Sequence, residues 1–220
     1  MKNLFGINSK FIEFMNTLAD VAVINFCFLI GCIPIVTAGA SVIAAFNVAL
    51  KIYDARDTHI FKQFWKAYAC NLKHGILLTL GFGVIIYGIW LDLQLFEAVE
   101  GNPIYFIIVG LVVFFVMLLH MMYIFPLEAR YEGTLIQNLR NARKIGVRFF
   151  TKTLLILVLW TVEILLFYGV NDVLFVIGCV IGPMTLIMTD AGIVLPVFKE
   201  LEREQRAGED GEEFSMSPEN

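Results

Sequence analysis

The chain has 220 residues, of which 59% are hydrophobic and 16% charged, and its mean hydropathy is +0.77. Soluble domains average about 45–50% apolar and about 25% charged residues, so this composition excludes an ordinary soluble globular protein. The formal charge of −4 is concentrated at one end, because residues 199–220 carry eight acidic and three basic side chains, which leaves residues 1–198 at +1.

Six apolar segments follow one another along the chain, and each is long enough to be compared with a membrane-spanning helix. A helix needs about 20 residues to cross a hydrocarbon core of about 30 Å. We therefore predict an all-α fold, a polytopic membrane helix bundle of about six transmembrane helices arranged as three hairpins. The spans are expected near residues 17–36, 38–52, 75–95, 104–127, 153–170 and 173–198.

Residues 1–198 are expected to form one membrane domain, followed at residues 199–220 by an acidic, disordered cytoplasmic tail. The end of this tail is acidic and shows no hydrophobic periodicity, which is typical of disordered, solvated segments. The second span is the weakest of the six because it has only about 15 residues. It is either a full crossing, tilted or broken near Pro34 and Gly39, or a re-entrant segment.

Basic residues divide the connecting segments into two classes. The turns near residues 34–38, 92–103 and 169–172 contain no Lys or Arg, whereas all 16 basic residues lie in the other segments. Short loops rich in Lys and Arg remain in the cytoplasm. We therefore predict a multi-pass protein of the bacterial cell membrane with cytoplasmic N- and C-termini.

A signal peptide is an alternative interpretation of the first apolar segment. Lys2 and Lys10 precede it, and residues 38–40 resemble a small-residue cleavage site. However, Glu13 and Asp20 interrupt the approach, and the apolar stretch exceeds the ~7–15 residues of a signal-peptide core. We therefore favour a span that is retained.

Each hairpin follows a cytoplasmic stretch that mixes basic and aromatic residues. Between residues 61 and 72, aromatic and leucine side chains recur at helical spacing while Lys62 and Lys66 occupy other positions on the turn. This pattern predicts amphipathic helices in the inner membrane interface, where the lipid bilayer and its anionic headgroups are the expected partners. The alternative is a surface that docks a cytoplasmic partner such as an ATPase.

Polar side chains inside the spans are the candidate functional residues, because a charge at a helix centre costs about 2.5–3.5 kcal/mol on insertion scales. This candidate intramembrane polar site comprises Glu163, Asp190, His120, Asp20, Asn25 and Asn47.

The first three of these side chains have two interpretations. Glu163, Asp190 and His120 can line a proton relay or solute path. In the packing alternative, which we favour, Glu163 pairs with a neighbouring helix, Asp190 lies near the inner headgroups and His120 binds a backbone carbonyl.

The other polar and small residues point to helix packing. Asp20, Asn25 and Asn47 can share a buried polar contact across the first hairpin. Small residues at four-residue spacing, namely Ser41, Ala45 and Ala49 and the pair Gly178 and Gly182, favour close helix approach.

Enzyme signatures are missing from the sequence. It contains no Gly-x-Ser-x-Gly, His-Glu-x-x-His, Walker loop or Gly-x-Gly-x-x-Gly motif. The four cysteines lack the spacing of a zinc site or redox pair. We expect a protein that is not an enzyme, with no catalytic residues, no cofactor, no metal site and no nucleic-acid partner.

Three segments carry a family resemblance: LADVAVINFCFLIGCIPIVTAGASVIAAFNVALKI, FKQFWKAYACNLKHG and FPLEARYEGTLIQNLRNA. Together they resemble the YesL-like family of bacterial membrane proteins, a domain of unknown function, over almost the whole chain except the acidic tail. The turn Pro34-x-x-Thr37-x-Gly39-Ala40 is the most specific part.

Members of that family are typically encoded beside sugar ABC importers, polysaccharide-degrading enzymes and two-component sensors. The resemblance therefore implies a non-enzymatic protein accessory to, or part of, a carbohydrate transport system of the ABC type. ABC transporter subunits or a sensor kinase are the implied partners. A stand-alone secondary transporter with an intramembrane acidic residue, and a membrane sensor or scaffold, are the alternatives.

Overall fold

The computed structural model describes residues 2–54, 59–98, 104–169, 171–207 and 217–218. Nearly all of these residues are helical, which confirms the predicted all-α class. The elements in chain order are α1 (Lys2–Gly31), the 3-10 helix η1 (Ile35–Thr37), α2 (Ala38–Asp54), α3 (Ile60–Cys70), α4 (Leu72–Ala98), α5 (Ile104–Arg130), β1 (Tyr131–Glu132), α6 (Leu135–Arg148), α7 (Phe150–Tyr168), α8 (Asp172–Ala207) and β2 (Ser217–Pro218).

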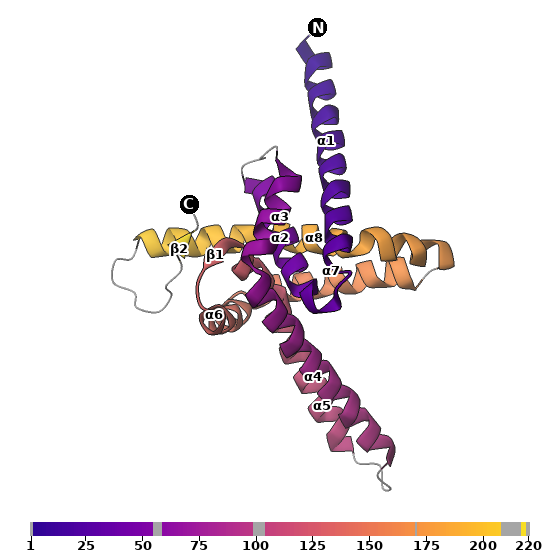
Figure 1. The fold of residues 1–220 in the computed structure, drawn as a ribbon. Helices are drawn as coiled ribbons and strands as arrows, with labels where there is room; N and C mark the ends of the chain where they lie inside the picture. Colours follow the sequence, from indigo (N-terminus) through magenta and orange to yellow (C-terminus); the bar gives the residue numbers. More distant parts are fainter. Residues whose placement is uncertain (1, 55–58, 99–103, 170, 208–216, 219–220) are drawn as a thin grey trace.

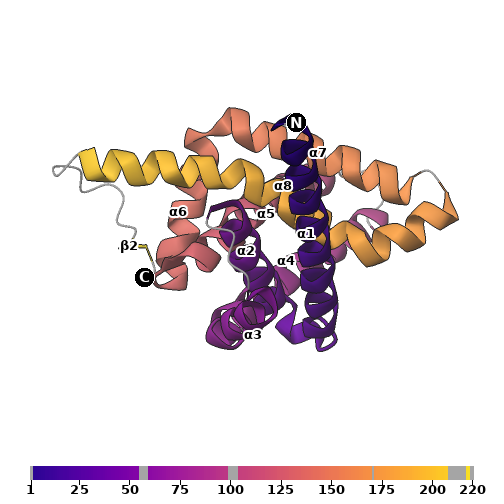
Figure 2. The same ribbon diagram turned by 90° about the horizontal axis from the view of Figure 1, so that it is seen from above.

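The expected three hairpins are present, since α1 packs on α2, α4 on α5 and α7 on α8. The α4/α5 and α7/α8 hairpins leave a common core as two arms that point in different directions (Figure 1). Viewed from above, the α4/α5 arm lies behind the core and α6 lies beside the core (Figure 2). The fold is therefore a bundle at its centre and splayed at its periphery.

Five helices are long and apolar enough to cross a membrane. Their spanning segments are Ile35–Asp54, Leu72–Phe96, Ile104–Arg130, Phe150–Phe167 and Asp172–Arg206. The first predicted span corresponds to the shorter apolar segment Met15–Gly31.

The turn at Pro34 explains why the first span ends before residue 36. A residue that precedes proline is disfavoured in helical conformation, and α1 stops at Gly31, three residues before Pro34. The Thr37 hydroxyl donates hydrogen bonds to the carbonyls of Gly31 and Pro34, at 3.1 and 2.8 Å. Thr37 thus satisfies carbonyls that the chain reversal leaves outside a helix.

Helix α2 is the centre of the core. Every residue from Gly39 to Leu50 except Val42 is buried, and the helix packs against α1, α3, α4, α5 and α8. The predicted stripe of small residues is confirmed as a packing device, because Ser41, Ala45 and Ala49 are all 0% exposed. A helix that is apolar all round is stable only when other helices enclose it in this way.

The outer parts of the two arms are exposed and apolar. Only 6% of the most apolar window of α4, and the same share of α5, is buried inside the protein. Val84 and Leu165, one on each arm, are 72% and 61% exposed. Such surfaces are stable against lipid tails, which are as apolar as the side chains themselves.

The prediction that the tail is disordered from residue 199 is wrong for its first part, which is helical. Helix α8 continues to Ala207, so its last nine residues fall within the segment 199–220 that we expected to be solvated. Phe198 and Leu201 are 0% and 3% exposed, and the Phe198 ring packs edge-on against Tyr131. The apolar face of α8 thus extends past the span and holds the helix on the core. Residues 208–216 and 219–220 lie outside the described residues, whereas β2 pairs antiparallel with β1.

Candidate functional site

A buried carboxylate joins three helices where α4 begins and α5 ends. The Glu128 side chain on α5 is 2% exposed, and its Oε2 lies 2.7 Å from Nδ1 of His74 on α4. Asn138 on α6 donates from Nδ2 to the Glu128 Oε1 at 2.9 Å. A buried carboxylate is costly unless it is paired and hydrogen-bonded, and both oxygens of Glu128 have a partner here.

The start of α6 brings Asn138 to this carboxylate. Thr134 caps the helix in an extended conformation and accepts a hydrogen bond from the Gln137 backbone N–H at 3.4 Å. The chain therefore turns within four residues of Arg130, and the first turn of α6 returns to the end of α5. Capping by threonine is a common way to begin a helix.

A second network lies next to the first and joins the ends of α2, α5 and α8. Arg130 donates from Nε to Glu202 at 2.9 Å and from Nη1 to Asp54 at 3.2 Å. Asp54 also pairs with Lys199 Nζ at 2.7 Å, and the Tyr131 hydroxyl donates to Glu202 at 2.6 Å. Burial and this hydrogen bond to Glu202 raise the pKa of Tyr131 above its ordinary value.

We call these two networks together the polar junction. Its members are Glu128, His74, Asn138, Arg130, Glu202, Asp54, Lys199 and Tyr131. The junction carries acid, base and amide groups with fixed partners, so it can hold the hairpins together. In the part of the chain that the structure covers, no group of three or more His, Cys, Asp or Glu side chains could hold a metal ion.

The predicted contact across the first hairpin is not formed as we expected. Asn25 is buried but donates to the Val180 carbonyl on α8, and Asn47 donates to the Ala129 carbonyl on α5 at 2.6 Å. Asp20 is half-buried on α1. The two asparagines therefore tie the first hairpin to later helices, because α2 lies between several neighbours rather than against α1 alone.

The other three candidate residues occupy separate places. His120 Nδ1 lies 2.7 Å from the Val116 carbonyl of its own helix, which is the backbone bond expected from packing. Glu163 on α7 is half-buried, and Thr185 on α8 interacts with it electrostatically. The packing interpretation, in which Glu163 pairs with a neighbouring helix, stays a prediction.

Asp190 is a buried acidic side chain on α8. It is 0% exposed, and neither carboxylate oxygen has a hydrogen-bond partner among the described residues. It therefore lies in the protein core. Asp190 interacts electrostatically with Tyr123. The Tyr123 hydroxyl is 2.8 Å from the Thr153 hydroxyl on α7.

The polar junction was not among the sites predicted from the sequence, although two signals were present. Glu128 and Arg130 come directly after an apolar run, so α5 carries its charges at one end. His74 stands at the corresponding end of α4, where a neighbouring helix end can meet it. The partners on α6 and α8 carried no such signal, because Asn138 and Glu202 are 10 and 72 residues from the side chains they bind.

The spans and the polar junction define an all-helical protein with several helices able to cross a membrane. A family model described as a protein of unknown function, DUF624, matches residues 21–93, from the middle of α1 to near the end of α4. No curated protein matches the chain. No solved structure matches it either.

Proposed function

We propose that the chain is a non-enzymatic membrane protein accessory to, or part of, a carbohydrate transport system, as the YesL-like resemblance implies. The supporting observation is the placement of its intramembrane polar groups. Asn25, Asn47 and His120 each bind a backbone carbonyl, and no described bond joins two of the candidate side chains. Separate bonds of this kind serve helix packing, whereas a proton relay needs connected groups.

The proposed contact with other transport subunits is the exposed face of α3. Phe61 is 59% exposed, and Lys62 and Lys66 are exposed beside it. The opposite face holds Phe64, which is 0% exposed and fixes the helix on the core. A rigid helix with an exposed aromatic and basic surface suits an acidic partner surface on an ATPase, a permease or a sensor kinase.

Copurification and sugar uptake test this proposal together. The full chain is expected to copurify with transport subunits from its native membrane, and the double substitution Lys62→Glu with Lys66→Glu should abolish that association. Lys152→Glu, at an exposed position on α7, is the matched control and should leave it intact. Unchanged growth of a deletion strain on every carbohydrate tested would rule out the carbohydrate assignment.

A second candidate function follows from Asp190. An unpartnered buried carboxyl group is costly, and intramembrane acids of this kind often carry protons or ions in transporters. A stand-alone carrier should move solute in proteoliposomes that contain this chain alone, and Asp190→Asn should stop coupled transport. Under the accessory proposal, the chain alone transports nothing and Glu163→Gln leaves function unchanged.

A further inference from the structure

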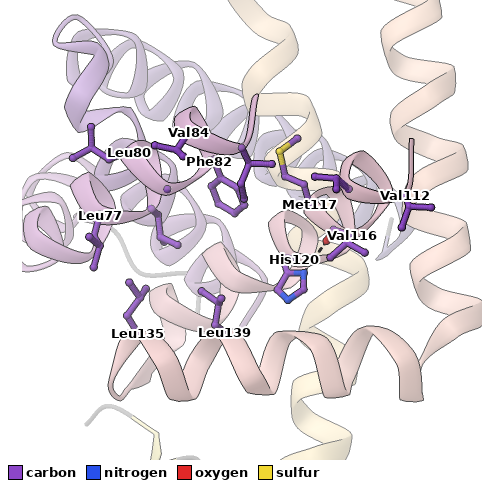
Figure 3. Close-up of a pocket in the computed structure, with 14 residues that line it drawn as sticks. Leu77, Leu80, Phe82, Val84, Val112, Val116, Met117, His120, Leu135 and Leu139 are labelled. Carbon is purple, nitrogen blue, oxygen red and sulfur yellow. Dashed lines mark hydrogen bonds between the residues drawn. The ribbon is translucent and has the colours of Figure 1, made fainter. Parts of the chain in front are cut away.

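An apolar groove separates the α4/α5 arm from α6. Its volume is about 590 Å³, and α4 and α5 form its two walls. Leu135 and Leu139 of α6 close it on one side, and His120 is the one polar side chain among the described residues that line it (Figure 3). Because the walls belong to two segments able to span a membrane, the groove opens where lipid tails are the solvent.

The polar junction sets the position of α6 across this groove. Asn138 lies between Leu135 and Leu139 in the sequence and binds the buried Glu128 of α5. At the other end of α6, Arg148 pairs with Glu204 of α8 at 2.7 Å. Helix α6 is thus anchored at both ends while its two leucines face the groove.

The dimensions of the groove match one lipid chain in one leaflet. On α4 the lining residues run from Leu77 to Ile85, which at 1.5 Å per residue is about 12 Å. They lie in the first half of α4, towards the end that carries the polar junction. Half of a hydrocarbon core of about 30 Å is about 15 Å deep.

Positive charge lies beside the groove. Leu135, Leu139 and Arg143 follow at four-residue spacing, so Arg143 continues the side of α6 that begins with the two leucines. Arg143 and Arg140 are both exposed. Basic residues at the membrane surface attract anionic lipids, and each contributes about 1 kcal/mol to the binding free energy.

We propose that this groove binds one acyl chain of an acidic phospholipid from the adjacent leaflet, with the headgroup held by Arg143 of α6. The apolar walls accept the chain, and the Arg143 guanidinium selects the charge of the phosphate. This site is independent of the proposed role in transport. It makes α6 a lipid-recognition element and not only an interfacial anchor.

Native mass spectrometry of the full chain tests the site. The chain is reconstituted in vesicles of phosphatidylcholine and phosphatidylglycerol in equal parts, extracted in mild detergent, and the retained lipids are counted. Phosphatidylglycerol should be retained in preference to phosphatidylcholine. Leu139→Trp, which fills the groove, should remove this retention, whereas Ile136→Trp, at a 75% exposed position of the same helix outside the lining, should not.

A second pair of variants separates headgroup recognition from chain binding. Arg143→Gln at an exposed position should lower the preference for phosphatidylglycerol about fivefold, and Arg203→Gln on α8 should leave it unchanged. Equal retention of both lipids by the unmodified chain would overturn the proposal, as would equal loss in the two tryptophan variants. Occupation of the groove by a second copy of the chain, seen as a lipid-free dimer that Leu139→Trp dissociates, would also overturn it.

Discussion

Helices α2 and α4 approach each other closely at Gly75, so a single methyl group added there is predicted to lower the free energy of unfolding. A Cβ there would lie 2.6 Å from the Ala40 Cβ and nearer still to the backbone nitrogen and Cα of Ala40. Carbon atoms in contact are about 3.5–4.0 Å apart, so the two helices would have to separate by about 1 Å. Backbone atoms cannot rotate away as a flexible side chain can, and α2 is enclosed by other helices that would move with it.

Gly75→Ala is therefore expected to lower the free energy of unfolding by about 1–3 kcal/mol, the range for overpacked cores. For a chain of this size, 2 kcal/mol corresponds to a fall in Tm of about 4–8 °C. Separation would also lengthen the hydrogen bond between the Gly39 N–H and the Thr79 hydroxyl, now 2.8 Å.

Gly83→Ala is the matched control, because it lies on the same helix and a Cβ there meets no atom within 4 Å. Since alanine is the better helix former, this control should be neutral or up to about 1 kcal/mol more stable. Scanning fluorimetry of both purified variants in detergent measures the difference. If Gly75→Ala unfolds at the temperature of the unmodified chain, the close approach of α2 and α4 is wrong.

Three further predictions concern the polar junction. Glu128→Ala leaves the Asn138 amide without its carboxylate partner, so the free energy of unfolding should fall by about 1–3 kcal/mol, with Glu128→Gln less affected; equal melting temperatures for both variants would contradict this. Arg130→Ala removes the shared partner of two carboxylates and should loosen the end of α8, measured as faster amide exchange there than in α2. Because the pKa of Tyr131 is raised in the folded chain, its hydroxyl proton is lost at lower pH from the unfolded chain than from the folded one. The free energy of unfolding should therefore decline as pH rises above about 10. Tyr131→Phe should weaken that decline, and an unaltered alkaline profile in this variant would refute the assignment.

Length and hydropathy were sufficient to predict the helical segments. The ends of α2, α4, α5 and α7 lie within about three residues of the expected spans, because apolar runs and the charges that flank them mark where a helix meets the interface. The predictions failed at the ends of the chain. Both Lys2–Asn16 and Lys199–Ala207 continue a spanning helix, since packing and helix propensity carry a helix beyond its apolar part.

The candidate site was harder to predict than the spans. Sequence identified which polar residues stand inside apolar segments, and the backbone bond of His120 was among the expected outcomes. It could not identify partners, because Asn25 and Asn47 bind carbonyls that are 155 and 82 residues away. A backbone carbonyl has no side-chain signature, so such a bond cannot be found from residue types. The contact of Glu128 with His74, 54 residues away, likewise could not be predicted from the sequence.

The enclosed position of α2 has a consequence for how the chain is made. The helix leaves the ribosome early, yet α5 and α8, which cover it, begin 50 and more than one hundred residues after it ends. At ordinary rates of translation, α2 waits on the order of ten seconds for its last neighbour. Until α4 and α5 are made, the Gly39 N–H and the Asn47 amide lack their native partners, the Thr79 hydroxyl and the Ala129 carbonyl, and face the insertion machinery or lipid instead. The first hairpin must therefore persist without its full set of packing partners until α8 is inserted.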